Sequence, residues 1–361
     1  MKNFFDNYNK IMMFPDELDL YLNNGNPYPI VTEIDISQRC NSNCPGCQYG
    51  ILCQDGSFKR KLGALMTFNQ LKNIIDQLRG KIKGLVFSGA SGDPLVNPDV
   101  VSIINYSAKY FPIIFITNGI AINKQIAETL MKNCVGLRIS LDAGTADLYK
   151  ITHGMPEIIF NQVLNNIRLL VRARKECDST CSLGIGFLTG KWGKTSSVPE
   201  MLIATKLAKD LSVDYIQFRT KHFDKENIND KLSLCKGFET KNFKVFASTP
   251  KYDLMGKKRI YSHCHMLHFF CVIDADLSVW PCCHLVGVKR FCLGNLKKQS
   301  FEIIWNSEKR QKIINSINPH SCLPLCRGNS TNIAIEKIKN GEIDPKSLDL
   351  SSVDKKHAVF L

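Results

Sequence analysis

Short, β-branched apolar runs alternate with longer amphipathic segments over the first two-thirds of the chain. Short runs of this kind predict strands, while apolar residues spaced three and four apart predict helices. Six repeats of a strand followed by a helix indicate a parallel sheet with right-handed crossovers, which can curl into a barrel. The six predicted strands are residues 30–36, 84–88, 113–117, 137–141, 183–188 and 215–219.

The clearest helical pattern covers residues 67–78, where apolar side chains recur on one face. Thr67 and Gln70 have the spacing of a capping box, and Gly80 suits the end of the helix. Two more helices are predicted around residues 160–171 and 201–211. The predicted fold class is α/β, with a partial (β/α)6 TIM-like barrel. In such barrels the chemistry lies at the C-terminal ends of the strands.

The pattern changes after Arg219. Residues 221–259 are polar, lysine-rich and irregular, which predicts a linker with room for one helix. Cysteines then become frequent between His263 and Arg327, and a final helix is predicted around residues 333–338. The predicted divisions are an N-terminal extension (1–29), a barrel (30–222), a linker (223–260), a small α+β cysteine-rich domain (261–330) and a tail (331–361).

The 361 residues include 15 cysteines, an odd number that does not fit a small secreted disulfide scaffold. The polar N-terminus lacks a signal-peptide pattern, and no apolar stretch reaches the ~18 residues of a membrane span. A cytoplasmic protein without a membrane partner is therefore predicted. The net charge is +14, but the basic residues are spread along the chain. Nucleic acid is not an expected partner.

Three cysteines directly follow the first predicted strand: Cys40, Cys44 and Cys47, with the spacing C-x3-C-x2-C. Three thiolates can hold three irons of a 4Fe–4S cube, which leaves the fourth iron open to a small molecule. An open coordination position distinguishes a catalytic metal site from a structural one. The alternative is a structural zinc site, with Cys53 as the fourth ligand.

This motif, after the first strand of a βα repeat, resembles the radical S-adenosylmethionine (SAM) superfamily. The loop Ser91-Gly92-Asp93-Pro94 follows the second strand and is similar to the family's Gly-Gly-Glu-Pro loop. The resemblance implies that Cys40, Cys44 and Cys47 are the catalytic cluster ligands. It also implies SAM contacts from Ser91, Gly92, Asp93, Pro94, Asn118, Arg138, Ser140 and Asp142. Gly46 departs from the family, which often has an aromatic residue there, and Tyr49 is a nearby substitute.

A second cysteine set lies in the C-terminal third, and it resembles the SPASM or twitch auxiliary-cluster domains of radical SAM enzymes. A hairpin at residues 272–280 and a helix start at 301–305 accompany it. The full SPASM pattern has seven cysteines, whereas this chain ends in a single C-x3-C pair. One auxiliary 4Fe–4S cluster is therefore predicted, with Cys283 as an alternative to Cys282 and zinc as an alternative metal. The predicted ligands are Cys264, Cys282, Cys322 and Cys326.

The resemblance implies reductive cleavage of SAM to a 5′-deoxyadenosyl radical, which abstracts hydrogen from a substrate C–H bond. The favoured substrate is a small molecule, such as a sugar or aminocyclitol, that is oxidised or epimerised. A ribosomal peptide or protein side chain is the alternative. Only about 29 residues precede the first strand, less than the ~80 that a leader-peptide-binding domain needs. A flavodoxin or ferredoxin would supply the electron. A zinc or iron–sulfur regulator that binds nucleic acid is the competing class.

Two further groups of polar residues are candidates for the substrate site. Glu33, Asp35 and Ser37 alternate on one face of the first strand, so they share the barrel interior. They would orient substrate, accept a proton, or form an interior hydrogen-bond network. Arg219 ends the sixth strand, where it would bind a carboxylate or phosphate, or form a surface ion pair.

Overall fold

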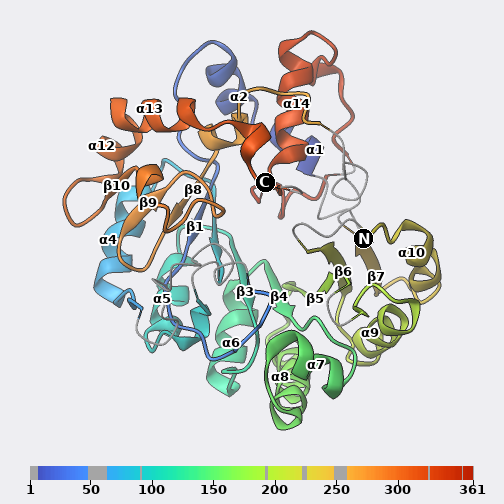
Figure 1. Cartoon of the computed structure of the whole chain (residues 1–361). Coiled ribbons are helices and arrows are strands. Elements are labelled where there is room, and N and C mark those ends of the chain that lie inside the picture. Colours follow the sequence, from blue (N-terminus) through green and yellow to red (C-terminus); the bar gives the residue numbers. More distant parts are fainter. Residues whose placement is uncertain are drawn as a thin grey trace.

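The computed structural model describes residues 7–47, 63–89, 92–191, 194–221, 226–247, 258–323, 326–351 and 353–360. One sheet of ten strands organises the chain, in the order β10-β9-β8-β1-β2-β3-β4-β5-β6-β7. Strands β1 to β7 are all parallel and adjacent in chain order. They curve around a common interior (Figure 1). The predicted α/β class and partial barrel are confirmed.

The six predicted strands are all present, with boundaries shifted by at most two residues. They are β1 (Val31–Ile34), β2 (Gly84–Phe87), β3 (Ile113–Thr117), β4 (Gly136–Ser140), β5 (Ser182–Thr189) and β6 (Tyr215–Thr220). A seventh parallel strand, β7 (Lys244–Ala247), pairs with β6. The sequence-based description of residues 221–259 as irregular with room for one helix missed this strand, although a helix, α10 (Asn229–Lys236), is present there. The alternating Phe243 and Val245 are buried, but the surrounding lysines mask this short pattern.

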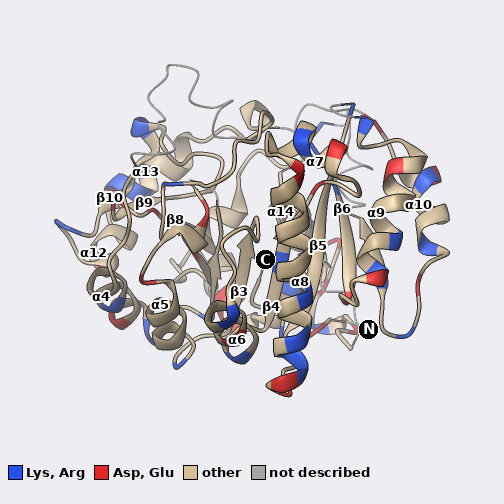
Figure 2. Cartoon of the chain, turned by 90° about the horizontal axis from the view of Figure 1, so that it is seen from below, with Lys and Arg blue, Asp and Glu red and all other residues tan. Residues whose placement is uncertain are grey.

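Helices cover the outer face of the barrel. They are α4 (Phe68–Leu78), α5 (Val100–Ser107), α6 (Lys124–Asn133), α7 (Ala146–His153), α8 (Glu157–Glu176), α9 (Val198–Asp210) and α10 (Asn229–Lys236). The α4 capping box is confirmed, because Thr67 Oγ1 accepts from Gln70 N and Gln70 Oε1 accepts from Thr67 N. Seen from below, basic residues along these helices are interspersed with acidic ones (Figure 2).

The cysteine-rich segment continues the same sheet. Strand β8 (Phe270–Ile273) pairs in parallel with β1, and β9 (Ser278–Trp280) forms the predicted hairpin with it. Strand β10 (Gly294–Asn295) completes this edge. The pairing gives the free edge of β1 a hydrogen-bonding partner. The helices that follow are α12 (Phe301–Trp305), α13 (Glu308–Ser316) and α14 (Asn329–Lys339).

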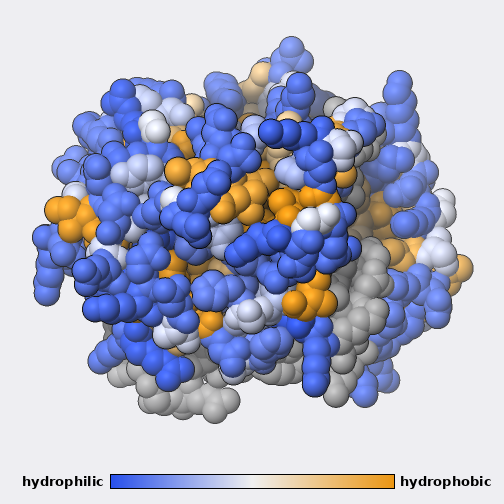
Figure 3. All heavy atoms as spheres, turned by 90° about the horizontal axis from the view of Figure 1, so that it is seen from above, coloured by the Kyte–Doolittle hydropathy of each residue, from blue (hydrophilic) through white to orange (hydrophobic). Residues whose placement is uncertain are grey.

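The two ends of the chain pack together over the inner face of the sheet (Figure 1). Helices α1 (Asn7–Lys10) and α2 (Pro15–Leu22) join α14 around a buried cluster that includes Val31 and Phe270. The buried Lys10 Nζ donates to Phe360 O at 2.7 Å. Seen from above, the surface of the molecule is mostly hydrophilic, with hydrophobic side chains gathered near its centre (Figure 3).

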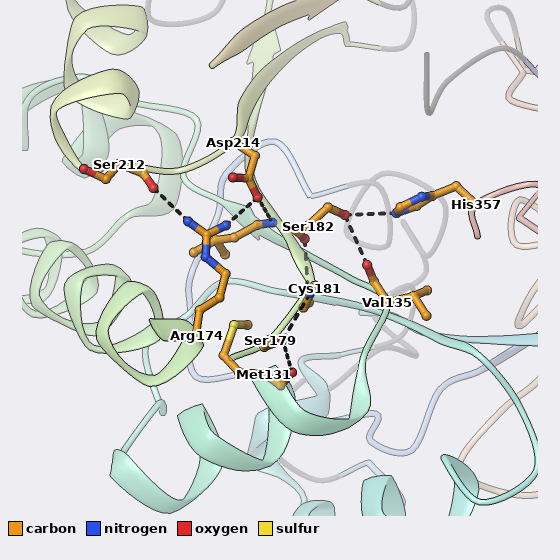
Figure 4. A network of polar contacts seen from close by, with 10 residues as sticks. Met131, Val135, Arg174, Ser179, Cys181, Ser182, Ser212, Asp214 and His357 are labelled. Atoms are coloured by element: carbon orange, nitrogen blue, oxygen red, sulfur yellow. Dashed lines mark hydrogen bonds and ion pairs between the residues drawn. The ribbon is translucent and has the colours of Figure 1, made fainter. Parts of the chain in front are cut away.

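A polar network ties the C-terminal tail to the start of β5 (Figure 4). His357 Nε2 lies 2.9 Å from Ser182 Oγ, which also donates to Val135 O. On the other side of the strand, Arg174 pairs with Asp214.

Short 3-10 helices complete the described chain: η1 (Ile11–Met13), η2 (Pro94–Val96), η4 (His265–His268), η5 (Lys289–Phe291), η6 (Pro319–Ser321) and η7 (Pro345–Ser347). Within the described ranges, no helix has the length and apolarity to cross a bilayer.

Trp305 holds α12 against the N-terminal segment. Its ring is fully buried, its Nε1 donates to Pro27 O at 2.8 Å, and it stacks on Phe301. Trp305→Ala should lower the free energy of unfolding by about 3–5 kcal/mol, the usual cost of removing a buried aromatic ring. Chemical denaturation monitored by circular dichroism would measure this. Ile303→Ala, on the same helix but 56% exposed, should cost less than about 0.5 kcal/mol.

Candidate active site

The loop after β1 brings Cys40, Cys44 and Cys47 together. Ser42 is at its centre: its backbone N donates to Cys40 Sγ at 3.5 Å, and its Oγ lies 3.2 Å from Cys44 Sγ. Cys47 N donates to Cys44 O at 3.2 Å, which closes a turn. Burial raises the pKa of Cys44 to about 12, opposed by Ser42 and reinforced by Asp142 and the other two cysteines. The three thiols are close enough to interact electrostatically.

This donor set fits an iron–sulfur cluster. Three thiols converge from one loop, and the hydrogen bonds to their sulfurs are of the kind that tunes such clusters. In the portion of the chain that the structure describes, no three His, Cys, Asp or Glu side chains converge tightly enough to hold a single metal ion. A 4Fe–4S cube instead places its thiolates around four irons. Cys53, the proposed fourth zinc ligand, and Tyr49 lie outside the described residues.

The loop after β2 is pressed against the cysteine loop. A side chain at Gly92 would place its Cβ 2.4 Å from Arg39 O and 2.6 Å from Ser37 O, so only glycine allows this contact. Asp93 N donates to Arg39 O at 2.8 Å, and Pro94 starts η2. The predicted loop residues Gly92, Asp93 and Pro94 are thus beside the cysteines. Ser91 lies outside the described residues.

The Asp93 carboxylate organises the neighbouring turn. It is 3% exposed and accepts from Thr117 Oγ1, from Leu95 N at 3.0 Å and from Asn118 N at 2.7 Å. Burial raises the pKa of Asp93, and these bonds oppose the shift. Asn118 Nδ2 in turn donates to Asn41 Oδ1 at 2.8 Å, inside the cysteine loop. The ends of β1, β2 and β3 therefore form one connected structure.

The three predicted residues of β4 and its end make different contacts. Arg138 Nη1 donates to Gln217 Oε1 at 3.0 Å, across the barrel interior. Ser140 O lies 3.1 Å from His153 Nε2. Asp142, at a positive φ of 48°, accepts from Leu188 N at 2.6 Å. Leu137, Ile139 and Leu141 face the core, as the predicted alternation requires. The SAM contacts of all eight residues remain predictions.

The four predicted auxiliary cysteines lie in one region. Cys264, Cys282 and Cys322 pack against the same buried residues, Leu267, Ile314 and Ile317. Burial raises the pKa of Cys264 to about 12, and Cys326 and Cys322 add to this shift. Asn332 Nδ2 donates to Cys264 Sγ at 3.4 Å, and His284 N donates to Cys282 Sγ at 3.4 Å. Cys283 touches Cys282 and packs in a second buried cluster that also includes Cys264, so Cys283 stays an alternative to Cys282.

An ion pair that sequence reasoning missed connects the two cysteine regions. Arg327, next to Cys326, reaches the barrel interior and donates from Nη1 to Glu33 Oε2 at 2.9 Å. Ser88 Oγ donates to the other Glu33 oxygen at 2.6 Å and lies 3.3 Å from Asp35 Oδ1. Glu33 and Asp35 thus share the interior face, as predicted, in a hydrogen-bonded network. The only sequence feature that pointed to this ion pair was Glu33, an acidic residue inside a predicted strand.

Gly92→Ala should separate the loop after β2 from the cysteine loop, because the added Cβ meets two backbone oxygens that cannot move independently. We expect SAM affinity to fall at least about tenfold, since SAM contacts depend on the relative position of these loops. Equilibrium dialysis with labelled SAM would measure this. Gly80→Ala is a suitable control, because nothing lies within 4 Å of its added Cβ, although its φ of 72° will cost some stability.

Comparison with known proteins agrees with this site. The family model of the radical SAM superfamily matches residues 34–191, and that of the SPASM iron–sulfur cluster-binding domain matches residues 264–329. No curated protein matches the chain.

Among solved structures, SuiB of Streptococcus suis bound to its precursor peptide SuiA shares 14% identity at a TM-score of 0.64, covering 93% of this chain and 78% of SuiB. Native anSMEcpe with bound AdoMet shares 17% identity at a TM-score of 0.58, covering 80% of this chain and 83% of anSMEcpe. These likenesses establish the fold. The two family models show that the chain belongs to the radical SAM superfamily and carries a C-terminal SPASM domain.

Proposed function

We propose that this radical SAM enzyme abstracts a hydrogen atom from a peptide or protein substrate. The observation that carries the proposal is the overall fold, which matches peptide-bound SuiB over more of the chain than the two family domains span. Another structure of similar fold, anSMEcpe, is bound to AdoMet and a peptide called Kp18Cys, with 18% identity and a TM-score of 0.57. The sugar or aminocyclitol substrate that the sequence favours is not confirmed by these structures.

The residues around the barrel mouth have distinct roles in this proposal. Cys40, Cys44 and Cys47 would hold the SAM-binding 4Fe–4S cluster, and Gly92 keeps the adjacent loop in place. When bound, the cluster and SAM would supply the radical chemistry that removes hydrogen from an unactivated C–H bond. The Asp93 and Asn118 hydrogen bonds hold the loop ends rigid, which keeps reacting groups aligned.

The C-terminal cysteines would hold one auxiliary 4Fe–4S cluster, with Cys264, Cys282, Cys322 and Cys326 as ligands. Four thiolates leave no iron open, which suits electron transfer better than substrate binding. The Glu33–Arg327 ion pair fixes this region against the first barrel strand. A flavodoxin or ferredoxin as reductant, a cytoplasmic location and the five predicted divisions of the chain remain part of the proposal.

The test is anaerobic reconstitution followed by reduction with dithionite in the presence of SAM. We expect about eight irons per chain, four for each cluster, and formation of 5′-deoxyadenosine. About four irons with 5′-deoxyadenosine formation would support the catalytic cluster and refute the auxiliary cluster. Zinc alone, without SAM cleavage, would refute the proposal. Deuterium transfer from a labelled peptide pool into 5′-deoxyadenosine would then test the substrate class.

A further inference from the structure

Two arginine side chains meet inside the barrel, above a glycine of the strand between them. Arg138 comes from β4 and Arg219 from β6, with Gly186 of β5 in the middle. A Cβ at Gly186 would lie 3.1 Å from Arg219 Nη2 and 3.3 Å from Arg138 Cδ. The absence of that Cβ lets both side chains lie over the same strand. The fold thus brings two positive charges together instead of separating them.

Neither guanidinium forms an ion pair with a residue that the structure describes, although Asp142 is near enough to Arg138 to favour its charge. Arg138 has one hydrogen bond, to the neutral Gln217, and the Arg219 side chain has none with a described residue. Both Nε atoms are buried and lack a hydrogen-bond acceptor. Burial, followed by repulsion from Arg219, lowers the pKa of Arg138 to about 9, so it stays charged at neutral pH.

Other inward or buried arginines have more partners. Arg310 is fully buried and likewise forms no ion pair with a described residue, but it donates to Asn26 Oδ1 and Leu267 O and lies over the Trp305 ring. Arg327 pairs with Glu33 at 2.9 Å, and Arg174 pairs with Asp214. A buried charge without a counter-charge is costly, and two adjacent like charges increase the cost. A site that keeps such a pair unmatched is ready to accept an anion. The two planar guanidiniums have a geometry suited to the two oxygens of a carboxylate.

We propose that Arg138 and Arg219 bind a carboxylate of the substrate, which is an acidic side chain or the C-terminal carboxylate of a peptide. This inference rests on the proposed function and deepens it. The cysteine loop, the loop after β2 and Asn118 all follow strands β1 to β3, whereas the arginine pair spans β4 to β6. The pair therefore lies on other strands of the interior wall than those that lead into the cysteine loop. This differs from the sequence-based grouping of Arg138 with the SAM contacts.

The experiment uses the full chain, reconstituted anaerobically and loaded with SAM. Binding of three probes is measured by saturation-transfer NMR: acetyl-Ala-Glu-Ala-amide, its glutamine counterpart, and acetyl-Ala-Ala with a free carboxylate. We expect at least one carboxylate probe to bind ten times or more tightly than the glutamine probe, as a charged Arg pair requires. The better carboxylate probe distinguishes a side-chain site from a C-terminal site.

The variants are Arg219→Gln, Arg138→Gln and the charge-preserving Arg219→Lys, with Arg168→Gln on the exposed face of α8 as the matched control. The carboxylate preference should disappear in both glutamine variants, weaken in Arg219→Lys and persist in the control. Equal or absent binding of all probes to the wild type would overturn the inference. So would a tenfold loss of SAM affinity in Arg219→Gln with the carboxylate preference intact, because the pair would then serve SAM.

The two proposals fail in distinguishable ways. Formation of 5′-deoxyadenosine without any probe reports on the catalytic site alone. If the wild type cleaves SAM but shows no carboxylate preference, the proposed cleavage chemistry stands and only the arginine site is refuted. If the wild type does not cleave SAM, the proposed function fails whatever the probes do.

Discussion

Replacing Cys44 with alanine is expected to lower 5′-deoxyadenosine formation by about three orders of magnitude or more, because the cluster loses one of three protein ligands and SAM cleavage depends wholly on it. Iron content should fall from about eight to about four per chain. The loss should be specific to this loop, because the auxiliary cysteines are held by separate contacts with Asn332 and His284. Iron analysis and chromatography of the SAM products measure both effects.

The matched control is Cys177→Ala. Cys177 is also partly exposed, but it caps the C-terminal end of α8, away from the cysteine loop. We expect its iron content and SAM cleavage to match the wild type. A complementary variant, Cys326→Ala, should lose iron while SAM cleavage without substrate continues. If Cys44→Ala retained both its iron and its cleavage activity, the assignment of Cys40, Cys44 and Cys47 as cluster ligands would be wrong.

The barrel strands were predictable because each has a buried apolar pattern and a turn at its end. Strand β3 occupies the predicted residues, and α4 begins after the predicted cap. Strand β7 was not predictable in this way, because it has only four residues and Lys241 and Lys244 interrupt its apolar pattern. Its stability comes from pairing with β6, a long-range contact that local sequence does not reveal.

The candidate site also has a part that local sequence reveals and a part that depends on long-range contacts. The spacing of Cys40, Cys44 and Cys47 is local, so the sequence displays it directly. The arginine pair depends on three neighbouring strands and on a glycine whose importance lies only in the missing Cβ. The β1–β8 pairing joins residues more than 230 positions apart, and its register is set by the folded sheet. Such contacts follow from the whole fold and have no local sequence pattern.

Removing Arg327 is the second change with a large expected effect. Glu33 is only 3% exposed, and Arg327 supplies its ion pair from 294 residues away. Burial opposes the charge of Arg327, but Glu33 and the nearby cysteines hold its pKa above the usual value. Arg327→Met keeps most of the packing on Phe270, yet it removes the charged partner of the buried Glu33 carboxylate and leaves the Ser88 hydroxyl as a donor. Such a carboxylate is strongly destabilising.

We expect Arg327→Met to lower the free energy of unfolding by about 2–4 kcal/mol, somewhat below the cost for a fully buried pair because Arg327 is 29% exposed. Adding Glu33→Gln to Arg327→Met should recover part of this loss, since it removes the unpaired negative charge of Glu33. Lys312→Met breaks the exposed pair with Glu308, and it should change stability by less than about 0.5 kcal/mol. Urea unfolding at equal iron content gives all three values. If Arg327→Met proved as mild as Lys312→Met, the ion pair would not be what joins the auxiliary region to β1, and the β1–β8 hydrogen bonds would have to do so alone.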